Sequence, residues 1–444
     1  MKKFIDTVKA IWSIEELRKK IIFTLGLIIV YRFGAQVSLP GIDPTQLENL
    51  QQQTSSNTLL DLLNQFTGGA FSKASIFALG IMPYISASIV VQLMGIAVPY
   101  LQKLQKAGES GRKKITQITR WLTIAVTLIQ GPSYVYNLYN QLPRSAFLID
   151  QTWLFVTISV IVLSTGTVFA MWLGEKITDK GIGNGISLLI MVGIIATFPS
   201  AFLQEFAYRV TNQNGGPMLL LFELVVWLLV VAASVILVKA YRPVPVQYAR
   251  RSVGGGYEKN IFGARQYLPL KLNAAGVMPI IFAQAMMFFP GMLASLSDSE
   301  WANTLKSIFS NMFDPWYNFV FAVLIIIFTY FYTAITVQTT KIAEDLKRSN
   351  GFIPGIRPGT DTANYLDEIL SKITFPGSIY LALIAVFPVF VYYIFPGMQI
   401  RWAMFYGGTS LLIVVGVAMD TIQQGEAYLL NRHYDNLMKT GRKR

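Results

Sequence analysis

Few side chains in this 444-residue chain could carry out catalysis or hold a metal ion. Cysteine is absent, which excludes disulfides, thiolate zinc sites and a cysteine nucleophile. His433 is the only histidine, so one chain cannot build a histidine metal site or a Ser-His-Asp triad. Residues 181–185 are rich in glycine, but they lack the Gly-Lys-Ser/Thr end of a phosphate loop and follow no predicted strand. The sequence therefore predicts no catalytic residue, no metal site and no cofactor.

Charged residues inside long apolar segments are the other place to look for chemistry, since in membrane proteins they usually mark ion or substrate pathways. Only Arg32 and Glu223 lie inside such segments. We expect Arg32 to face the protein interior and pair with a carbonyl or a carboxylate. Glu223, near the outer end of its helix, is expected to extend toward the membrane interface. Asp420 falls at a helix end, so no buried acidic pair is expected, which argues against proton or sodium transport and against an intramembrane aspartyl protease.

The composition indicates a membrane protein. Charged residues make up 14% of the chain, against roughly 25% in soluble proteins, and hydrophobic residues make up 53%. Mean hydropathy is +0.46. A helix needs about 20 mainly apolar residues to cross a bilayer. Ten segments meet that description: 21–37, 76–98, 121–138, 153–173, 186–203, 218–238, 274–293, 318–337, 375–395 and 403–419.

The basic residues predict how these segments are oriented. The N-terminus, the even-numbered connections and the C-terminus together hold 31 of the 37 Lys and Arg residues. The opposite connections hold five, and Arg32 completes the set. Cytoplasmic loops carry this kind of excess, so both termini are predicted to be cytoplasmic. The net charge of +13 then lies on the cytoplasmic face, where it could meet anionic lipid, an acidic partner or RNA.

Ten spans with both ends on one side divide into two halves of five, which have opposite orientations. We predict a first half at 1–203, an external hinge loop at 204–217 and a second half at 218–444. A Gly-x-Met-Pro sequence opens the second span of each half, at 80–83 and 276–279, although chance could produce this echo. Its proline frees a backbone carbonyl, so both helices are expected to bend or to start irregularly there.

Two other parts of the chain are unusual. The segment from Thr58 to Phe66 is too short to cross a bilayer, so it is either an interfacial helix or a helix folded back into the protein from outside. The cytoplasmic connections 239–273 and 338–374 are each about 35 residues long, whereas most connections have 2–8. Their basic residues either bind a partner or only determine topology.

Isoleucine recurs four residues apart on two of the predicted helices, at Ile81 and Ile85 and at Ile186 and Ile190. Residues at this spacing share one helix face. They could line an apolar route through the protein. From the spacing alone, ordinary packing or lipid contact is the better interpretation.

Six runs of sequence together identify a family resemblance, because they occur in order and are spread along most of the chain. They are 72–92, 108–115, 171–187, 268–279, 352–362 and 406–415. These runs resemble the SecY family, the channel subunits of the bacterial protein translocase. The resemblance implies an all-α polytopic membrane protein. Ten transmembrane helices would form two inverted five-helix halves around an hourglass pore, with a short external plug helix.

The resemblance also assigns roles to residues. Its constriction ring falls on Ile81, Ile85, Ile186, Ile190, Ile281 and Ile413. Its plug falls on 58–71, with Leu59, Leu60, Asp61, Leu62, Leu63 and Phe66. The lateral gate, between spans two and three and spans seven and eight, would include Gln92 and Asn273. Contacts for the motor or the ribosome would be Arg250, Arg251 and Arg357. Pro243 departs from the family's adjacent basic residues, so contacts at that position are in doubt.

The resemblance implies a non-enzymatic protein-conducting channel in the bacterial cytoplasmic membrane. It would translocate unfolded secretory chains and release signal sequences and transmembrane helices into lipid. Expected partners are the SecE and SecG subunits, the SecA motor ATPase, the ribosome with its nascent chain, signal peptides and membrane lipids. The alternative is a secondary transporter of a small solute, which would need paired polar groups near the bilayer midplane.

Overall fold

The computed structural model describes most of the chain. The residues outside the description are 1–11, 13, 48–63, 150, 212–215, 249–265, 295–299, 301–303, 305–307, 310, 396 and 442–444. A helix lies over each of the ten segments predicted to span the membrane. Among the described residues, five helices are long and apolar enough to cross a membrane by length and composition alone, and the number rises to as many as seven if each of two bent helix pairs is one span.

The first group of elements runs to the end of α9 and the second begins with α10. The first comprises α2 (Glu15–Gly34), η1 (Pro44–Gln46), α5 (Met82–Ala97), α6 (Pro99–Lys106), α7 (Glu109–Gln141), η2 (Arg144–Ala146), α8 (Thr152–Lys180) and α9 (Gly185–Thr211). The second comprises α10 (Gly216–Lys239), β1 (Tyr241–Tyr248), β2 (Gln266–Lys271), α11 (Met278–Ala294), α13 (Pro315–Thr336), α14 (Thr339–Arg348), β3 (Gly351–Phe352), α15 (Thr360–Ile394), α16 (Ile400–Ala403), η3 (Met404–Tyr406) and α17 (Gly408–Gly441).

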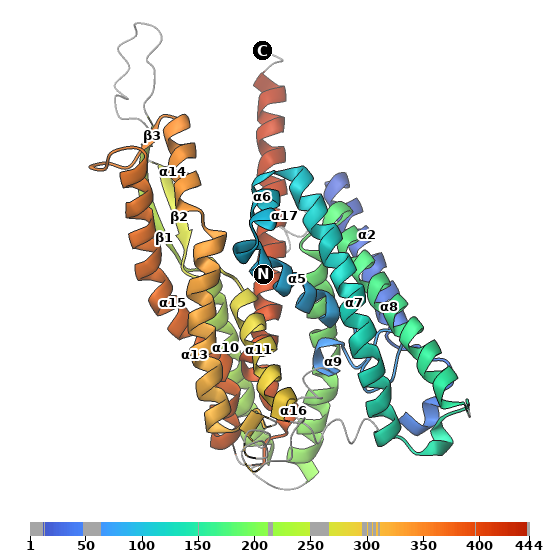
Figure 1. The fold of residues 1–444 in the computed structure, drawn as a ribbon. Coiled ribbons are helices and arrows are strands. Elements are labelled where there is room, and N and C mark those ends of the chain that lie inside the picture. The colour runs from blue at the N-terminus through green and yellow to red at the C-terminus, as the bar shows by residue number, and fades with distance from the viewer. Residues whose placement is uncertain are drawn as a thin grey trace, which may run out of the picture.

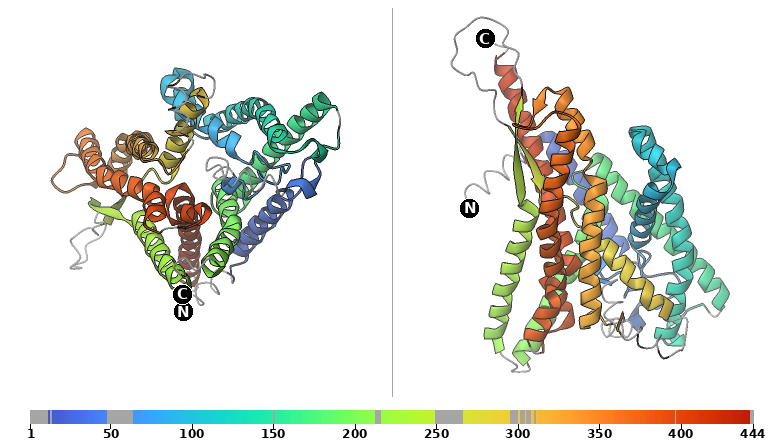
Figure 2. Two further views of the ribbon diagram at one scale, coloured as in Figure 1. Left: turned by 90° about the horizontal axis from the view of Figure 1, so that it is seen from below. Right: turned by 60° about the vertical axis from the view of Figure 1, so that its left-hand side comes forward.

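The two groups pack extensively against each other through one helix. In the first group α5 packs on α7, α7 on α8, and α8 on α9; in the second α11 packs on α13 and α13 on α15. Between the groups, extensive packing of the described helices joins α9 to α10, α16 and α17. The groups diverge from this contact, with α5 and α7 on one side and α11 and α13 on the other (Figures 1 and 2). Among the described helices, α9 therefore provides the main packing contact between the two groups.

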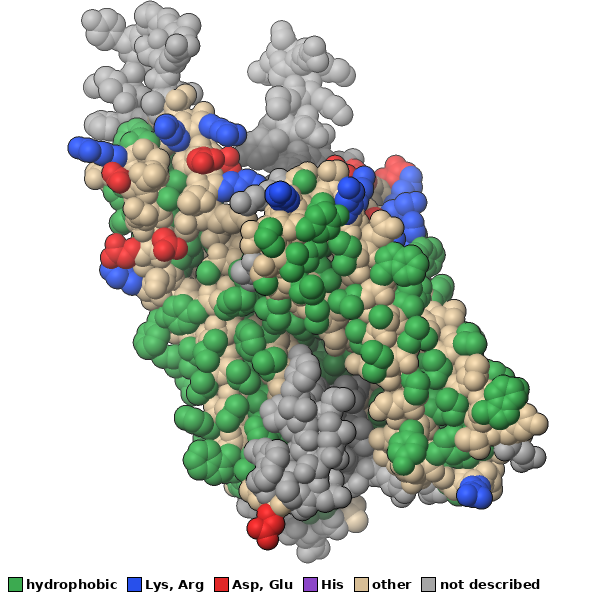
Figure 3. All heavy atoms as spheres, in the orientation of Figure 1, with side chains coloured by type: hydrophobic (Ala, Val, Ile, Leu, Met, Phe, Trp, Pro, Cys, Tyr) green, Lys and Arg blue, Asp and Glu red, His purple; other side chains and the backbone are tan. Residues whose placement is uncertain are grey.

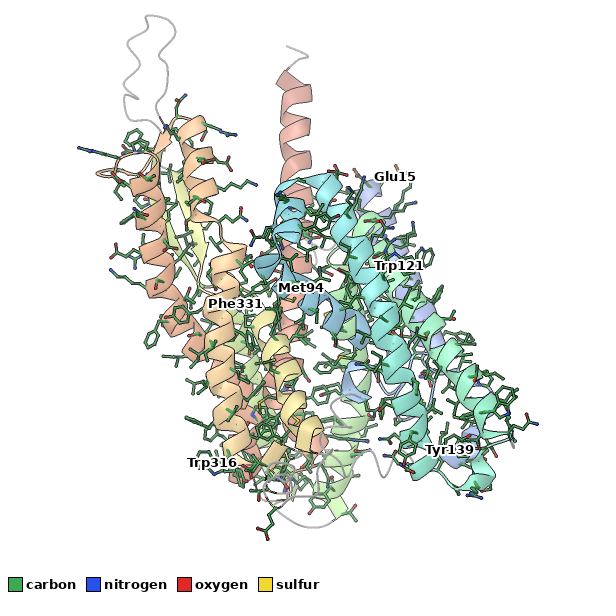
Figure 4. The ribbon with its side chains drawn as sticks, viewed as in Figure 1. Glu15, Met94, Trp121, Tyr139, Trp316 and Phe331 are labelled. Carbon is green, nitrogen blue, oxygen red and sulfur yellow. The ribbon has the colours of Figure 1, made fainter. Side chains whose placement is uncertain are left out.

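The outer surface matches a protein that crosses a bilayer. Hydrophobic side chains cover the middle of the face in Figure 3, and most Lys and Arg gather at its upper end. Trp121 lies near the upper end and Trp316 near the lower end (Figure 4), and these side chains are 68% and 67% exposed. Exposed tryptophans at two levels are typical of the two membrane–water interfaces.

Prolines set where two of the helices begin, as the sequence predicts. α5 starts at Met82, with Pro83 in its first turn, and α11 starts at Met278, followed by Pro279. Proline suits this position because the first amides of a helix have no partner within it. The apolar residues 76–81, predicted to belong to the span, form turns instead. Gly80 and Gly276 precede the two helices with positive φ angles of 53° and 65°.

The two long connections that are predicted to be cytoplasmic contain a small sheet that the all-α prediction did not include. β1 pairs antiparallel with β2 and with β3, giving the order β2-β1-β3. Val244 and Val246 of β1 are buried against Leu366 and neighbouring residues of α15. Pro243 and Pro269 face each other in the β1–β2 pair. The sequence did not indicate this hairpin because both strands contain proline, which has no backbone N–H to donate to a neighbouring strand.

A buried ion network joins the two groups at α9. Arg209 Nε lies 2.7 Å from Glu205 Oε1, and Arg209 Nη2 donates to Glu223 Oε1 of α10 at 2.6 Å. Glu205 Oε2 accepts from the backbone N–H of Gln399 at 2.8 Å. The side chains of the two glutamates are fully buried, and that of Arg209 is 1% exposed.

The network corrects two expectations. Glu223 does not extend toward the interface, and a buried acidic pair, Glu205 and Glu223, is present. The reason is that α9 continues to Thr211, well past the predicted end of its span at residue 203. Its last turns carry Glu205 and Arg209 alongside the start of α10. Buried charges are tolerated only when they are paired in this way.

We predict that Arg209→Met lowers the free energy of unfolding by about 3–5 kcal/mol, because it leaves two buried carboxylates without a counter-charge. Thermal unfolding of the purified protein in detergent measures this effect. The control is Arg120→Met, which removes the ion pair of Arg120 with Glu175 between α7 and α8. Arg120 is 49% exposed there, so the control should cost only about 0–1 kcal/mol. Equal effects of the two substitutions would contradict the prediction.

Candidate functional site

The six isoleucines to which the resemblance assigns the constriction ring share one apolar cluster. They come from four helices: α5 carries Ile85 and begins just after Ile81, α9 carries Ile186 and Ile190, α11 carries Ile281, and α17 carries Ile413. Ile81, Ile190 and Ile413 are buried, and the other three pack against the same apolar cluster. The structure therefore brings together residues up to 332 positions apart, from both groups of helices.

The plug predicted at 58–71 is described in part. Leu59, Leu60, Asp61, Leu62 and Leu63 lie outside the described residues. Residues 64–66 are helical and the chain then turns repeatedly up to α5. Phe66 is buried and belongs to the same cluster as the isoleucines. Asn64 Oδ1 accepts from the backbone N–H of Ser72 at 3.0 Å, and Tyr134 of α7 donates to the carbonyl of Phe71 at 2.8 Å. This segment is thus fixed beside the six isoleucines.

Arg32 pairs with a carbonyl, which is one of the two partners expected for it. Its Nη1 donates to the carbonyl oxygen of Gly68 at 3.0 Å. Arg32 also lines a cavity of about 250 Å³, together with Lys73 and Arg401, and no carboxylate is among the lining residues. Lys73 donates to Gln36 at 2.5 Å. Burial and the neighbouring Arg32 lower the pKa of Lys73 below its usual value.

The predicted gate residues do not bond to each other in this structure. Gln92 donates to Ser88 of its own helix at 3.3 Å. Asn273 lies in the turn before α11, and its buried Oδ1 has no hydrogen-bond partner in the described part of the chain. Extensive packing is absent between α5 or α7 and α11 or α13 among the described helices. The two pairs of helices therefore face each other across a seam without close helix-to-helix packing.

Arg357 projects from a platform that is formed by the sheet, α14 and α15 at the end predicted to be cytoplasmic. It is exposed, and its turn contains Gly355 and Gly359 with φ angles of 84° and 109°. Its carbonyl accepts from the hydroxyl of Thr362 in the first turn of α15 at 2.8 Å. The turn therefore fixes the backbone while the guanidinium extends outward. Arg250 and Arg251 lie outside the described residues.

Several central residues were not singled out from the sequence. Glu205 and Arg209 could have been noticed as an oppositely charged pair four residues apart. Ser410, whose hydroxyl donates to Gln65 at 2.8 Å, gives no such signal. Phe405, which completes the central cluster, is one apolar residue among many. Groups of three or more His, Asp or Glu residues that could hold a metal ion do not occur in the described parts of the chain.

Known proteins are similar in sequence to most of this chain. The sequence profile of the SecY family matches residues 75–422. A protein translocase subunit SecY from Streptomyces scabiei is 41% identical over 436 residues, which are 96% of this chain and 97% of that protein.

Solved structures of channels share the fold. One, on how the plug domain of the SecY protein stabilises the closed state and maintains a membrane seal, aligns with a TM-score of 0.61 at 17% identity. Another, of Sec61 in the canine ribosome–channel complex from the endoplasmic reticulum, gives a TM-score of 0.57 at 17% identity. Each covers 92% of both chains.

Proposed function

The chain belongs to the SecY family, and from that premise we propose that it is the channel subunit of a protein translocase. It passes unfolded secretory polypeptides across the bacterial cytoplasmic membrane and releases signal sequences and transmembrane helices sideways into lipid. The observation that carries this proposal is that six isoleucines from both groups of helices share one apolar cluster, of which Phe66 is also a buried member. The chain is a multi-pass membrane protein. The uneven distribution of its basic residues supports cytoplasmic N- and C-termini.

The six isoleucines act as the pore constriction. A narrow apolar ring stays free of water and therefore resists ions while no polypeptide is present. The ring also has no fixed polar partner that would select one translocated side chain over another. It encloses a passing chain by rotamer changes of flexible apolar groups. The segment 58–71 acts as the plug, and Phe66 is its described contact with the ring.

The seam between α5 and α7 on one side and α11 and α13 on the other acts as the lateral gate. The halves 1–203 and 218–444 move apart along this seam about the connection 204–217. Gln92 and Asn273 line the polar part of the gate. The unpartnered Oδ1 of Asn273 supports this role, because a buried carbonyl oxygen without a donor is available to a polar partner when the gate rearranges.

The cytoplasmic platform binds the partners that drive transport. We assign Arg250, Arg251 and Arg357 to contacts with the SecA motor ATPase and the ribosome. The structural likeness to Sec61 in a ribosome–channel complex supports the ribosome as a partner. SecE and SecG complete the channel. The chain itself is not an enzyme, so the energy for transport comes from SecA, from synthesis on the ribosome or from the proton-motive force.

A transporter of a small solute fits the structure less well. Such a protein needs convergent polar groups at the middle of the membrane. The six isoleucines instead share one apolar cluster, with Phe66 and Phe405 among its buried members. The polar cavity beside Arg32 lies next to the plug segment rather than between the isoleucines.

We predict that Ile413→Asn makes the idle channel leak, raising its conductance about tenfold, because a polar side chain in the ring allows water and ions to enter. Conductance of the purified channel complex in planar bilayers measures the leak. The adjacent Leu412 provides the control. It packs into the interior of the second group of helices, so Leu412→Asn should reduce stability without opening a path for ions. A channel that stays closed with Asn at both Ile190 and Ile413 would rule out the ring.

Crosslinking tests whether a polypeptide passes this point. Because the chain has no cysteine, single cysteines can be introduced without background. We expect Ile281→Cys to form a disulfide with a cysteine in a stalled secretory chain. Leu229→Cys, on α10 and 64% exposed at the lipid-facing surface, should not. Equal crosslinking at the two positions would mean that the translocating chain does not run through the isoleucine ring.

We predict that Arg357→Lys reduces SecA-driven export into vesicles roughly tenfold, because lysine lacks the forked donors that arginine offers to a carboxylate or phosphate. The charge is conserved, so insertion of the channel should not change. Arg348→Lys, at the exposed end of α14, is the matched control and should export normally. Full export by Arg357→Lys and by Arg357→Glu, at equal channel abundance, would leave Arg357 with a role in topology alone.

A further inference from the structure

Arg32 is the one charged residue within the first span, and neither the isoleucine ring nor the gate uses it. Its guanidinium is directed at the plug segment, where Nη1 donates to the carbonyl of Gly68 at 3.0 Å. A charged donor on a carbonyl oxygen makes a stronger hydrogen bond than a neutral donor does. The contact therefore holds the plug segment to α2, in the first group of helices.

A second side-chain hydrogen bond holds the same segment to the other group. Ser410 Oγ of α17 donates to Gln65 Oε1 at 2.8 Å. Both residues are buried, with Gln65 at 6% and Ser410 at 3% exposure. Hydrogen bonds between buried side chains are not readily replaced by water, so breaking one has a cost. Two residues of the plug segment, Gln65 and Gly68, are thus bonded to helices from the two groups.

Close backbone packing adds to these bonds. Gly68 has a φ angle of 65°, and a β-carbon at this position would meet Arg32 Nη1 and come within 2.8 Å of Gly193 Cα on α9. A β-carbon at Gly193 would come within 2.6 Å of the carbonyl oxygen of Phe66. The plug segment and α9 can approach this closely because both contacting residues, Gly68 and Gly193, lack a side chain. By contrast, a β-carbon at Gly69 would meet nothing within 4 Å.

We propose that Arg32 and Ser410 are positioning residues that latch residues 65–68 over the isoleucine ring in the idle channel. This latch consists of Arg32, Gln65, Gly68 and Ser410, and it rests on the proposed channel function. Arg32 and Ser410 belong to different groups of helices, so movement of the groups apart lengthens at least one of the two bonds. Opening of the seam is thereby coupled to release of the plug.

The cavity beside the latch makes its release reversible. When Gly68 moves away, the guanidinium of Arg32 is already at the wall of a polar cavity of about 250 Å³, where Gln36, Thr197 and Ser200 provide oxygen acceptors. The charge is therefore not left in an apolar environment, which would be far more costly. The plug can leave and return without requiring a new counter-ion for Arg32.

Arg32→Met and Ser410→Ala test the latch, each in the complete channel complex. Two measurements are made: idle conductance in planar bilayers, and SecA-driven export of a preprotein whose signal sequence is defective. We expect both to increase, by about tenfold for Arg32→Met and about threefold for Ser410→Ala, because each lost bond raises the population with a displaced plug. Arg32→Lys, which keeps one charged donor, should fall between the parent and Arg32→Met. A residue needed only for folding would reduce export and would not increase export of a defective substrate.

A pair of glycine substitutions checks the packing separately. Gly68→Ala and Gly69→Ala both place a methyl group on a backbone with positive φ, so both carry backbone strain. Only the methyl at position 68 meets Arg32 and Gly193. Gly68→Ala should therefore leak more than Gly69→Ala, and equal behaviour of the two would count against the latch.

The outcome also separates the latch from the channel function. If Arg32→Met and Ser410→Ala stay as closed and as selective for signals as the parent, while Ile413→Asn leaks, the channel function stands and the latch is rejected. Loss of export without idle conductance in both variants rejects the latch as well. Absence of a secretory chain from the isoleucine ring in the crosslinking experiment would instead overturn the proposed channel function.

Discussion

The apolar contact at the centre of the bundle is the interaction on which the other features of this protein depend. Phe66, Ile81 and Ile190 of the first group of helices meet Phe405, Ile413 and Val417 of the second in one cluster. Apolar surfaces associate without a directional bond, so such a contact can separate and form again around a different apolar surface. A permanent polar site at the same place would bind part of every polypeptide that crossed it. The cluster can therefore close the path and still yield to a chain of any sequence.

The polar interactions at the contact between the two groups differ in strength from those at the plug segment. At α9 the pairing of Glu205, Arg209 and Glu223 is fully buried and joins the two groups firmly, since removal of one partner would leave an unpaired charge. At the plug the polar contacts are single hydrogen bonds from Arg32 and Ser410, beside a cavity. The strong network thus lies at the contact between the two groups, and the weaker bonds lie at the segment that we propose to move.

The end of the protein that carries the small sheet and Arg357 is organised differently. The two long connections are not loops alone, because β1 and β2 form a hairpin that buries Val244 and Val246 against α15. This packing fixes the base of the turn that carries Arg357. Without this packing, the basic residues of such long connections would have no fixed positions. A small apolar core therefore gives this end of the protein a defined shape.

The amino-acid sequence was sufficient to predict the membrane class, a helix over each of ten apolar segments, and six isoleucines that share one apolar cluster in the structure. Each of these follows from local properties: the length of apolar runs, the uneven distribution of basic residues, proline at a helix start, and motifs that resemble the SecY family. The partners of charged and polar groups could be identified only from the tertiary structure. Glu223 was expected at the interface, and the additional turns of α9 bring Arg209 to it instead. Likewise Ser410 meets Gln65, 345 positions away, in a contact that no local pattern signals. Burial and pairing depend on which segments fold side by side, and that information is not local in the chain.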